Sequence, residues 1–280
     1  MSAVLPRSGV VLGVASLVLG EGMTPEIGRE VVRAAVEAGA AAIDTARAYA
    51  TVDDDAAGER LAATAREVEP GIPLITKAGH FRLGTAAWDA DGSAERLRRD
   101  AERSREVFGA PPSLLLLHRA DRVDDVLASL RVLAELRDEG VVEAIGLSNA
   151  SVELLEAAAG VTTIDAVQNR LGLGVDPIAE YRFCHEHGID FLAYAPFGGP
   201  RAAPLATRIP HVAALAMGRG ASIHRLALAA MIDALPGLWP VIGSTRVETV
   251  RDSIAARHEV VDDELRTAFR DDLRSRGVGL

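Results

Sequence analysis

The sequence predicts an α/β protein folded as a single (β/α)₈ barrel, or TIM barrel, that spans residues 1–280. The length suits this fold, because one barrel domain typically takes ~250 residues. Short apolar runs alternate with longer amphipathic segments, and eight such alternations occur along the chain. Runs of this kind indicate strands that are buried on both faces, as in a parallel sheet.

The eight expected strands are separated by enough residues for a helix in each interval. They are residues 10–12, 42–43, 74–75, 114–117, 144–147, 164–167, 191–193 and 240–242. An open, doubly wound sheet is the alternative arrangement. It usually carries a G-x-G-x-x-G loop after its first strand, and no such pattern follows residues 10–12 here. The barrel is therefore favoured.

Helix signals lie between these runs. Thr24 precedes Pro25, a residue favoured at the first helical position, and Gly39 is expected to end that helix. Segments 124–139 and 262–273 carry further helical stripes, and Thr245 with Glu248 has the spacing of a capping box. Residues 196–210, rich in Gly, Pro and Ala, form the longest irregular stretch and are expected to be a binding loop.

The composition narrows the class of partners. A formal net charge of −10 argues against sequence-independent binding of nucleic acid, which requires a basic surface. No run reaches the ~18 apolar residues that a membrane span requires. The one cysteine, Cys184, excludes an internal disulfide and is expected to be a packed thiol on a helix. We therefore expect a cytoplasmic protein that acts on a small molecule; the sequence leaves the oligomeric state open.

Polar residues at the ends of successive strands indicate an active site. Asp44, Lys77 and His118 close the second, third and fourth strands, and Tyr49 follows Asp44 in the next loop. Taken singly, these residues could cap a helix or pack in the core. In a barrel, however, the carboxyl ends of the strands meet at one rim, where active sites lie. The sequence therefore predicts that the four side chains act together.

These residue types suit proton transfer to a carbonyl oxygen. A phenol has a pKa near ~10, and a neighbouring ammonium such as Lys77 is expected to lower the pKa of Tyr49. A buried ammonium requires a counter-charge, which Asp44 could supply. His118 could orient the carbonyl oxygen and share its developing charge. None of these groups can donate a hydride, so a nicotinamide cofactor would have to do so.

Seven short motifs resemble the aldo-keto reductase family over about residues 11–256. They are Ile43-Asp44-Thr45-Ala46 with Tyr49, Thr76-Lys77, Leu117-His118, Gly146-Leu147-Ser148-Asn149, Val167-Gln168-Asn169, Tyr194-Ala195-Pro196 and Gly243-Ser244-Thr245-Arg246. The resemblance implies NADPH-dependent reduction of an aldehyde or ketone to an alcohol. It assigns the catalytic roles to Tyr49, Lys77, Asp44 and His118, and it implies no metal.

The resemblance also implies a cofactor site. Ser148, Asn149 and Gln168 would hold the nicotinamide carboxamide, and the ring of Tyr194 would stack on the nicotinamide. The pyrophosphate would lie under residues 196–200 and the adenosine 2′-phosphate near Ser244, Thr245 and Arg246, at a helix N-terminus. The other expected cofactor-binding residues are Ala195, Pro196, Phe197, Gly243, Asp252 and Ser253. Ser148 and Asn149 could instead cap a helix.

Several positions depart from the family pattern. Asp252-Ser253 stands where Glu-Asn is frequent, and Thr249 stands where a second basic residue is common. Both departures weaken the prediction of NADPH relative to that of NADH, so NADH is kept as the alternative cofactor. Phe81 and Trp88 are expected to line the substrate pocket, although Trp88 could equally cover a helix at the surface.

Three other functions are weighed against carbonyl reduction. A regulatory subunit could bind the cofactor with little turnover, and a biosynthetic variant could act on one natural-product intermediate. A metal-dependent hydrolase could use Asp44, His80 and His118. That ligand set is sparse, no His-x-His pair occurs, and Lys77 would occupy the centre of the site. The complete set of four strand-end residues favours the reductase.

Overall fold

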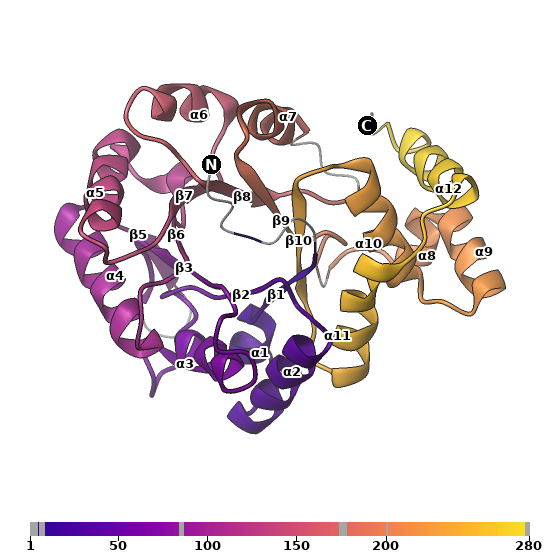
Figure 1. Ribbon diagram of the computed structural model, residues 1–280, viewed down its shortest axis with the longest axis horizontal. Coiled ribbons are helices and arrows are strands. Elements are labelled where there is room, and N and C mark those ends of the chain that lie inside the picture. Colours follow the sequence, from indigo (N-terminus) through magenta and orange to yellow (C-terminus); the bar gives the residue numbers. More distant parts are fainter. Residues whose placement is uncertain (1–4, 6–8, 84–86, 174–177, 200, 278–280) are drawn as a thin grey trace.

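The computed structural model describes residues 5, 9–83, 87–173, 178–199 and 201–277. Among these residues, eight parallel strands close into a barrel with helices outside them, as Figure 1 shows. The predicted barrel is confirmed. In barrel order, the strands are β1 (Val11–Gly13), β10 (Leu238–Gly243), β9 (Asp190–Tyr194), β8 (Ala166–Arg170), β7 (Ile145–Ser148), β6 (Leu114–Leu117), β3 (Leu74–Ala78) and β2 (Ala42–Asp44).

Each predicted strand is found, with small shifts at its ends. The largest shift is at β8, which we expected at residues 164–167 but which runs from Ala166 to Arg170. A search for apolar runs stops too early there, because Gln168 and Asn169 are polar residues buried within the strand. Their side chains form hydrogen bonds inside the protein, so the strand continues past the end of its apolar run.

Helices surround the barrel, and several of them begin at clear capping signals. Thr24 caps the helix that Pro25 opens, and Ser93, Asp125, Ser151 and Asp262 cap four others in the same way. The α-helices are α1 (Ala15–Leu19), α2 (Pro25–Glu37), α3 (Ala57–Ala63), α4 (Ala94–Phe108), α5 (Val126–Asp138), α6 (Val152–Ala159), α7 (Ile178–His187), α8 (Leu205–Arg208), α9 (Pro210–Arg219), α10 (Ile223–Ala234), α11 (Val247–Ile254) and α12 (Asp263–Arg274). Short 3₁₀ helices are η1 (Thr64–Glu67), η2 (Ala120–Arg122) and η3 (Ala255–His258).

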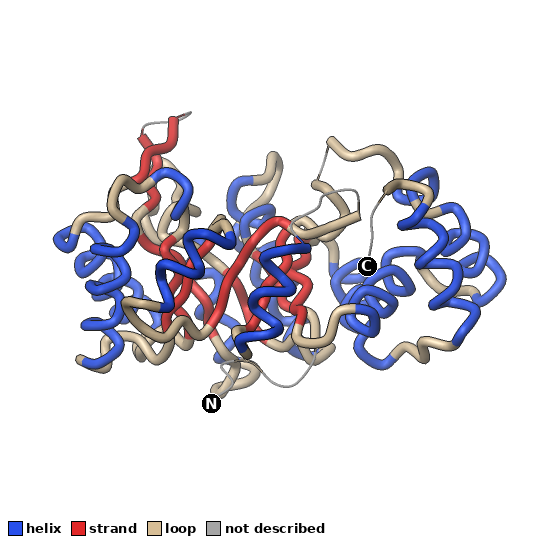
Figure 2. The backbone as a smooth tube through the Cα atoms, turned by 90° about the horizontal axis from the view of Figure 1, so that it is seen from above, coloured by secondary structure: helices blue, strands red, loops and turns tan. Residues whose placement is uncertain are grey.

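Two parts of the chain differ from the expected pattern. The stretch 196–210 is not irregular throughout, since α8 lies within it and α9 begins at Pro210; Pro200 lies outside the described residues. An unexpected antiparallel hairpin, β4 (His80–Leu83) and β5 (Ala87–Ala90), follows β3. In Figure 2 this hairpin projects from the barrel, away from the N-terminus. It therefore adds a wall beside the ends of the strands.

The two faces of the barrel strands have different surroundings. Alternate residues such as Val11, Ile75, Leu116, Leu192 and Trp239 form one buried cluster inside the barrel. Their neighbours pack instead against the helices in two larger clusters. Since side chains alternate between faces along a strand, the residue two positions after an inward one also points inward. The inward-facing positions at the carboxyl ends of the strands therefore place polar side chains at the rim of the barrel.

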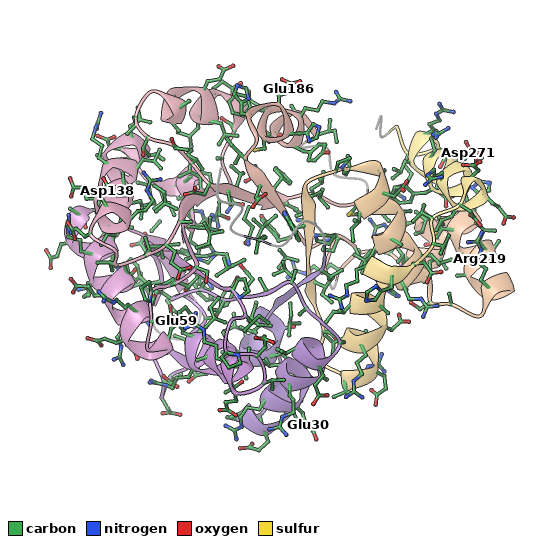
Figure 3. All side chains as sticks on the ribbon, viewed as in Figure 1. Glu30, Glu59, Asp138, Glu186, Arg219 and Asp271 are labelled. Atoms are coloured by element: carbon green, nitrogen blue, oxygen red, sulfur yellow. The ribbon has the colours of Figure 1, made fainter. Side chains whose placement is uncertain are left out.

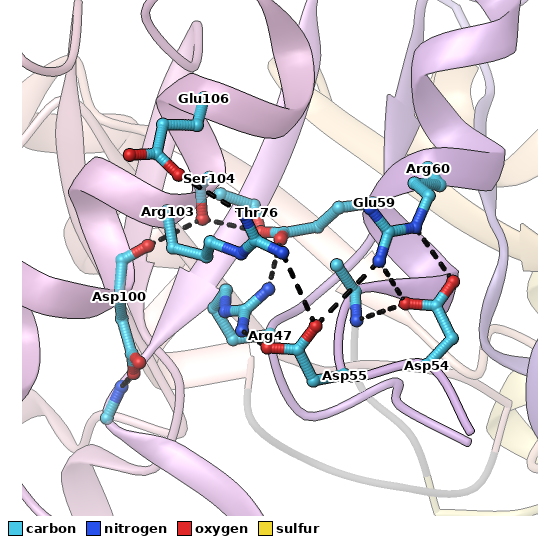
Figure 4. Close-up of polar contacts among 12 residues, drawn as sticks. Arg47, Asp54, Asp55, Glu59, Arg60, Thr76, Asp100, Arg103, Ser104 and Glu106 are labelled. Carbon is cyan, nitrogen blue, oxygen red and sulfur yellow. Dashed lines mark hydrogen bonds and ion pairs between the residues drawn. The ribbon is translucent and has the colours of Figure 1, made fainter. Parts of the chain in front are cut away.

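A second group of buried charges lies outside the barrel, between the strands and the helices α3 and α4. Glu59 is fully buried and accepts hydrogen bonds from Arg47 Nη1 at 2.7 Å, from Thr76 Oγ1 at 2.8 Å and from Ser104 Oγ (Figure 4). Charged side chains such as Glu30 and Asp138 lie on the outer edge, whereas Glu59 lies inside (Figure 3). The Glu59 network is the name used below for Glu59 and its three donors, Arg47, Thr76 and Ser104.

Candidate active site

Lys77 and Asp44 form an ion pair at the upper end of the barrel interior. Lys77 follows the inward residue Ile75 by two positions, and Asp44 follows Ala42 in the same way. Lys77 Nζ donates to both carboxylate oxygens of Asp44, at 2.7 and 2.8 Å, and to the carbonyl oxygen of Thr45 at 2.7 Å. The expected counter-charge of Lys77 is therefore confirmed.

This ion pair keeps Lys77 charged although its side chain is buried. Burial alone would lower the pKa of Lys77, but attraction to Asp44 and contact with the Tyr49 phenol raise that pKa above its ordinary value. The carboxylate has a third partner, because Gln168 Nε2 donates to Asp44 Oδ2 at 2.8 Å. The pair is thus held on several sides, which limits the movement of the ammonium.

Tyr49 lies against the Lys77 ammonium, which is 5.3 Å from the centre of the phenol ring. The ammonium acts to lower the pKa of Tyr49, as expected, but a larger effect opposes it. Burial raises the pKa of Tyr49 above the ordinary value, and the charge of Lys77 offsets that rise only in part. The phenol is therefore protonated at neutral pH and can donate a proton.

His118 lies beside Tyr49, with the two ring centres 5.9 Å apart and the rings nearly perpendicular. Burial, and then the positive charge of Lys77, hold the pKa of His118 well below its usual range. Its Nδ1 atom is buried and has no hydrogen-bond partner among the described residues. The imidazole is therefore neutral at neutral pH, so that it can offer an N–H group without adding a second positive charge.

The side chains at the ends of β7 and β9 support one another. Tyr194 donates through its hydroxyl to Asn149 Oδ1 at 2.8 Å, and Asn149 Nδ2 donates to the carbonyl oxygen of His118 at 3.0 Å. Asn149 and Ala195 have φ angles of 62° and 51°, in a region that residues other than glycine seldom occupy. Helix α6 is capped by Ser151, so the alternative role of Ser148 and Asn149 as its cap is wrong.

A cleft of about 800 Å³ opens at this rim. Of the four residues predicted to be catalytic, Asp44, Tyr49 and His118 line the cleft, while Lys77 lies buried behind them. The predicted cofactor-binding residues that also line it are Ser148, Asn149, Gln168, Tyr194, Ala195, Pro196, Phe197, Gly243, Ser244, Thr245, Arg246 and Ser253. Residues far apart in the sequence thus meet around one space.

Asp252 is the predicted cofactor-binding residue that the structure does not place on the cleft. Its carboxylate accepts a hydrogen bond from Ser222 Oγ and lies 3.7 Å from Arg225 Nη1. Ser222 caps α10, so these contacts join α11 to the start of that helix. Asp252 therefore has a role in helix packing.

Helix α11, which follows the cleft residues Ser244, Thr245 and Arg246, begins one residue later than expected. Its N-cap is Arg246, in an extended conformation, and no side chain caps it. The predicted capping box of Thr245 and Glu248 is therefore wrong. Ser244 Oγ instead bonds within the turn, to the N–H and carbonyl groups of Arg246. Thr245 and Arg246 are both exposed, and Arg246 forms no ion pair within the described part of the chain.

The structure separates the two aromatic residues that were expected to line the substrate pocket. Phe81 lines none of the cavities described here, and its ring lies under the Arg96 guanidinium at 4.0 Å. Trp88 does line a smaller cavity, together with Tyr49 and His118. The two residues differ because they lie on opposite faces of the hairpin, in adjacent cross-strand pairs.

Several lining residues were not expected from the sequence. They are Gly13, Ala15, Ser16, His80, Arg119, His224, Val241 and Ile242, whereas Gly199 and Thr249, which also line the cleft, lie in segments expected to meet the cofactor. Ser16 could have been found, because it is a polar residue just beyond the end of the first strand. Arg119 could also have been found, since it directly follows His118. His224 belongs to helix α10, and no strand-end signal would indicate it.

The described residues contain no group of three or more His, Cys, Asp or Glu side chains that could hold a metal ion. Asp44 bonds to Lys77 and Gln168 instead. No helix in the described ranges is both long and apolar enough to cross a membrane. Fold and site together define a barrel protein whose rim holds a protonated phenol, a buried ammonium–carboxylate pair and a neutral imidazole beside a long cleft.

Comparison with known proteins identifies the family. The model of the Aldo/keto reductase family matches residues 10–270, and the chain belongs to this family. An uncharacterized oxidoreductase of Schizosaccharomyces pombe is 25% identical over 218 residues, which cover 76% of this chain and 68% of that protein.

Solved structures share the fold. The glycerol dehydrogenase of Gluconobacter oxydans has a TM-score of 0.79 at 21% identity, over 99% of this chain and 97% of that one. An aldo-keto reductase of Bombyx mori, solved in complex with NADP, has a TM-score of 0.75 at 21% identity, over 94% of this chain and 88% of that one.

Proposed function

We propose that this protein reduces an aldehyde or ketone to an alcohol, with NADPH as the hydride donor and Tyr49 as the proton donor. The observation that carries the proposal is the position of the Tyr49 phenol, which lines the cleft and lies against the ammonium of the Lys77–Asp44 pair. Family membership supports an oxidoreductase, and the NADP complex of the Bombyx mori relative supports the cofactor class.

The residues of the cleft fit a nicotinamide dinucleotide. A volume of about 800 Å³ lies within the ~300–1,000 Å³ of typical small-molecule sites. Ser16 Oγ is buried, lacks a hydrogen-bond partner among the described residues and belongs to the lining. Ser148, Asn149 and Gln168 would hold the carboxamide, Tyr194 would support the nicotinamide ring, and Arg246 would contact the 2′-phosphate. When bound, the nicotinamide would supply a hydride.

The protein's own residues would handle the proton. The carbonyl oxygen would lie between the Tyr49 hydroxyl and the neutral His118 ring, and both would donate hydrogen bonds to it. As negative charge develops on that oxygen, Tyr49 would transfer its proton. The Lys77 ammonium would stabilise the resulting phenolate, and Asp44 would keep Lys77 charged and in position. For alcohol oxidation the same groups would act in reverse.

Tyr49→Phe tests the proton donor. We expect the turnover of NADPH with a panel of aldehydes to fall by ~10²–10⁴-fold, because general acid catalysis contributes about that much. The dissociation constant for NADPH, measured by fluorescence titration, should change little. Tyr181→Phe is the matched control, since that hydroxyl bonds to the Pro236 carbonyl oxygen, away from the site. Retained turnover in Tyr49→Phe would remove Tyr49 from the acid role.

Tight NADPH binding by a wild-type protein that reduces no carbonyl compound would favour a regulatory subunit.

Arg246→Ala tests the choice of cofactor. Arg246 is exposed at the N-terminus of α11, where backbone N–H groups also favour an anion. Its removal should raise the KM for NADPH by about tenfold or more, the effect of losing one charged hydrogen-bond donor. The KM for NADH should change much less. Equal changes in both constants would mean that Arg246 does not contact the 2′-phosphate.

A further inference from the structure

A second cavity, of about 290 Å³, shares Tyr49 and His118 with the main cleft. Its lining residues are Leu19, Tyr49, His80, Trp88, His118, Arg119 and Arg122. The hairpin β4–β5 supplies one side, and the segment that leads from β6 into η2 supplies another. A carbonyl group held between Tyr49 and His118 would therefore place the rest of its molecule within reach of this cavity.

His80 is a buried polar residue that the proposed reaction does not use. Its side chain stacks on Trp88, with ring centres 5.3 Å apart, and meets the edge of His118 at 4.7 Å. The residue is 7% exposed, and both ring nitrogens lack a hydrogen-bond partner within the described residues. A buried polar atom without a partner costs ~1–3 kcal/mol, so such atoms commonly mark a place where a ligand or water binds.

The hairpin that carries His80 is firmly anchored. The N–H group of Gly79 donates to Asp100 Oδ2 at 3.0 Å, and the carbonyl oxygen of Gly79 accepts from the Asp91 N–H at 2.9 Å. Gly79 itself has a φ of 76°, which suits glycine. His80 therefore stands at a defined position on the cavity wall.

Positive charge prevails around this cavity. Arg119 is paired with Asp121 through two hydrogen bonds, whereas Arg122 is exposed and forms no ion pair in the part of the chain that the structure describes. Burial, and then the charges of Arg119 and Arg122, lower the pKa of His80 to about 4. The opposing effects of Asp121 and Asp89 on that pKa are smaller. An anionic group would therefore be favoured beside His80.

We propose that this cavity is a subsite for a carboxylate, so that the protein prefers aldehydes or ketones with an apolar body and an acidic group. Arg122 would pair with the carboxylate, and an N–H of His80 would donate to it. Trp88 and the 39% exposed side chain of Leu19 would cover the apolar body. The proposal rests on the proposed function, because it uses Tyr49 and His118 to hold the carbonyl oxygen.

Matched pairs of substrates test the subsite. The kcat/KM values of 3- and 4-carboxybenzaldehyde would be compared with those of their neutral methyl esters, with NADPH as the cofactor. At least one acid should exceed its ester by about tenfold, the effect of one charged hydrogen bond. Arg122→Gln and His80→Phe should each lower this acid-to-ester ratio toward one. Arg131→Gln, an exposed arginine on α5, is the control and should leave the ratio unchanged.

Two failures can be told apart. If esters and acids are reduced equally well, or if Arg122→Gln slows both equally, the carboxylate subsite is wrong while the reductase stands. If the protein reduces neither these aldehydes nor any member of the aldehyde panel, the proposed function fails, and the subsite is judged by calorimetric titration with 4-(hydroxymethyl)benzoate and its methyl ester. Tighter binding of the acid that is lost in Arg122→Gln would support the subsite, and equal binding would overturn it.

Discussion

Two buried ion pairs lie on opposite faces of the same strand. Lys77 of β3 points into the barrel and pairs with Asp44. Thr76, its neighbour in β3, points outward and joins the Glu59 network, where Arg47 pairs with Glu59 (Figure 4). Both pairs are nearly inaccessible to solvent, so burial alone does not distinguish a functional pair from a structural one.

Their surroundings make the difference. Glu59 has three donors from the protein and touches neither cavity at the rim, so it can act as a junction between β3, α3 and α4. The Lys77–Asp44 pair lies instead against Tyr49, a group with an exchangeable proton that faces the cleft. A buried charge becomes functional when it acts on such a group. Variants of each pair therefore test whether the Lys77–Asp44 pair is functional and the Arg47–Glu59 pair structural.

The largest expected effect follows Lys77→Met. Loss of the ammonium removes the charge that lowers the pKa of Tyr49, so the phenol becomes a weaker acid. We expect kcat for aldehyde reduction to fall on the order of 10²–10⁴-fold. Arg47→Met is the matched control, because it removes the cation of the other buried pair, and kcat should change by only a few fold. Similar losses of kcat in both variants would refute the distinction.

The next effect is one of stability. Glu59→Gln keeps the shape of the side chain but leaves Arg47 without its buried charge partner. The free energy of unfolding should fall by about 3–5 kcal/mol, the usual result of breaking a buried pair. Asp55, the other partner of Arg47, has a side chain that is 67% exposed. Asp55→Asn should therefore lower the free energy of unfolding by only about 0–1 kcal/mol. Urea unfolding measures both, and equal losses would contradict a buried junction at Glu59.

A third effect is a dependence of stability on pH that arises from two histidines of the site. The pKa of His118 lies well below its usual range, and the pKa of His80 is about 4. The unfolded chain binds protons to these residues near pH ~6.5, before the folded protein does, so stability falls as the pH drops from about 6.5 toward 4.

The slope from each histidine is at most about 1.4 kcal/mol per pH unit. Unfolding in urea at pH 7 and pH 5 measures it, and His80→Phe should reduce it. His187→Phe, on the exposed surface of α7, is the control. An undiminished slope in His80→Phe would mean that His80 is not held neutral by its surroundings.

Much of this architecture follows from local sequence features. Apolar runs at regular intervals predicted the barrel strands, because a parallel strand is buried on both faces. Capping signals such as Thr24 before Pro25 placed helix starts correctly. The pairing of Lys77 with Asp44 was also predictable, since a buried ammonium requires a nearby carboxylate.

Other features depend on contacts between distant segments. The polar end of β8 pairs with β9 as far as Arg170, and its Gln168 side chain bonds to Asp44, 124 positions away. The net direction of the Tyr49 pKa depends on how deeply the folded chain buries the phenol, a property that residue type does not encode. The hairpin β4–β5 follows a barrel strand in place of a helix and breaks the simple alternation. Its two faces then separate Phe81 from Trp88.

The residue types and their alternation along each strand were enough to predict the barrel and to bring Asp44, Lys77 and His118 to its rim. The tertiary structure decided which of those side chains meet a cavity, how far burial shifts their pKa values, and which buried charges have partners. Alternation is a local property of the chain, whereas burial and pairing arise when segments far apart in sequence close around the same space. His80 illustrates this, because its place beside Trp88, His118 and the two arginines exists only in the folded protein.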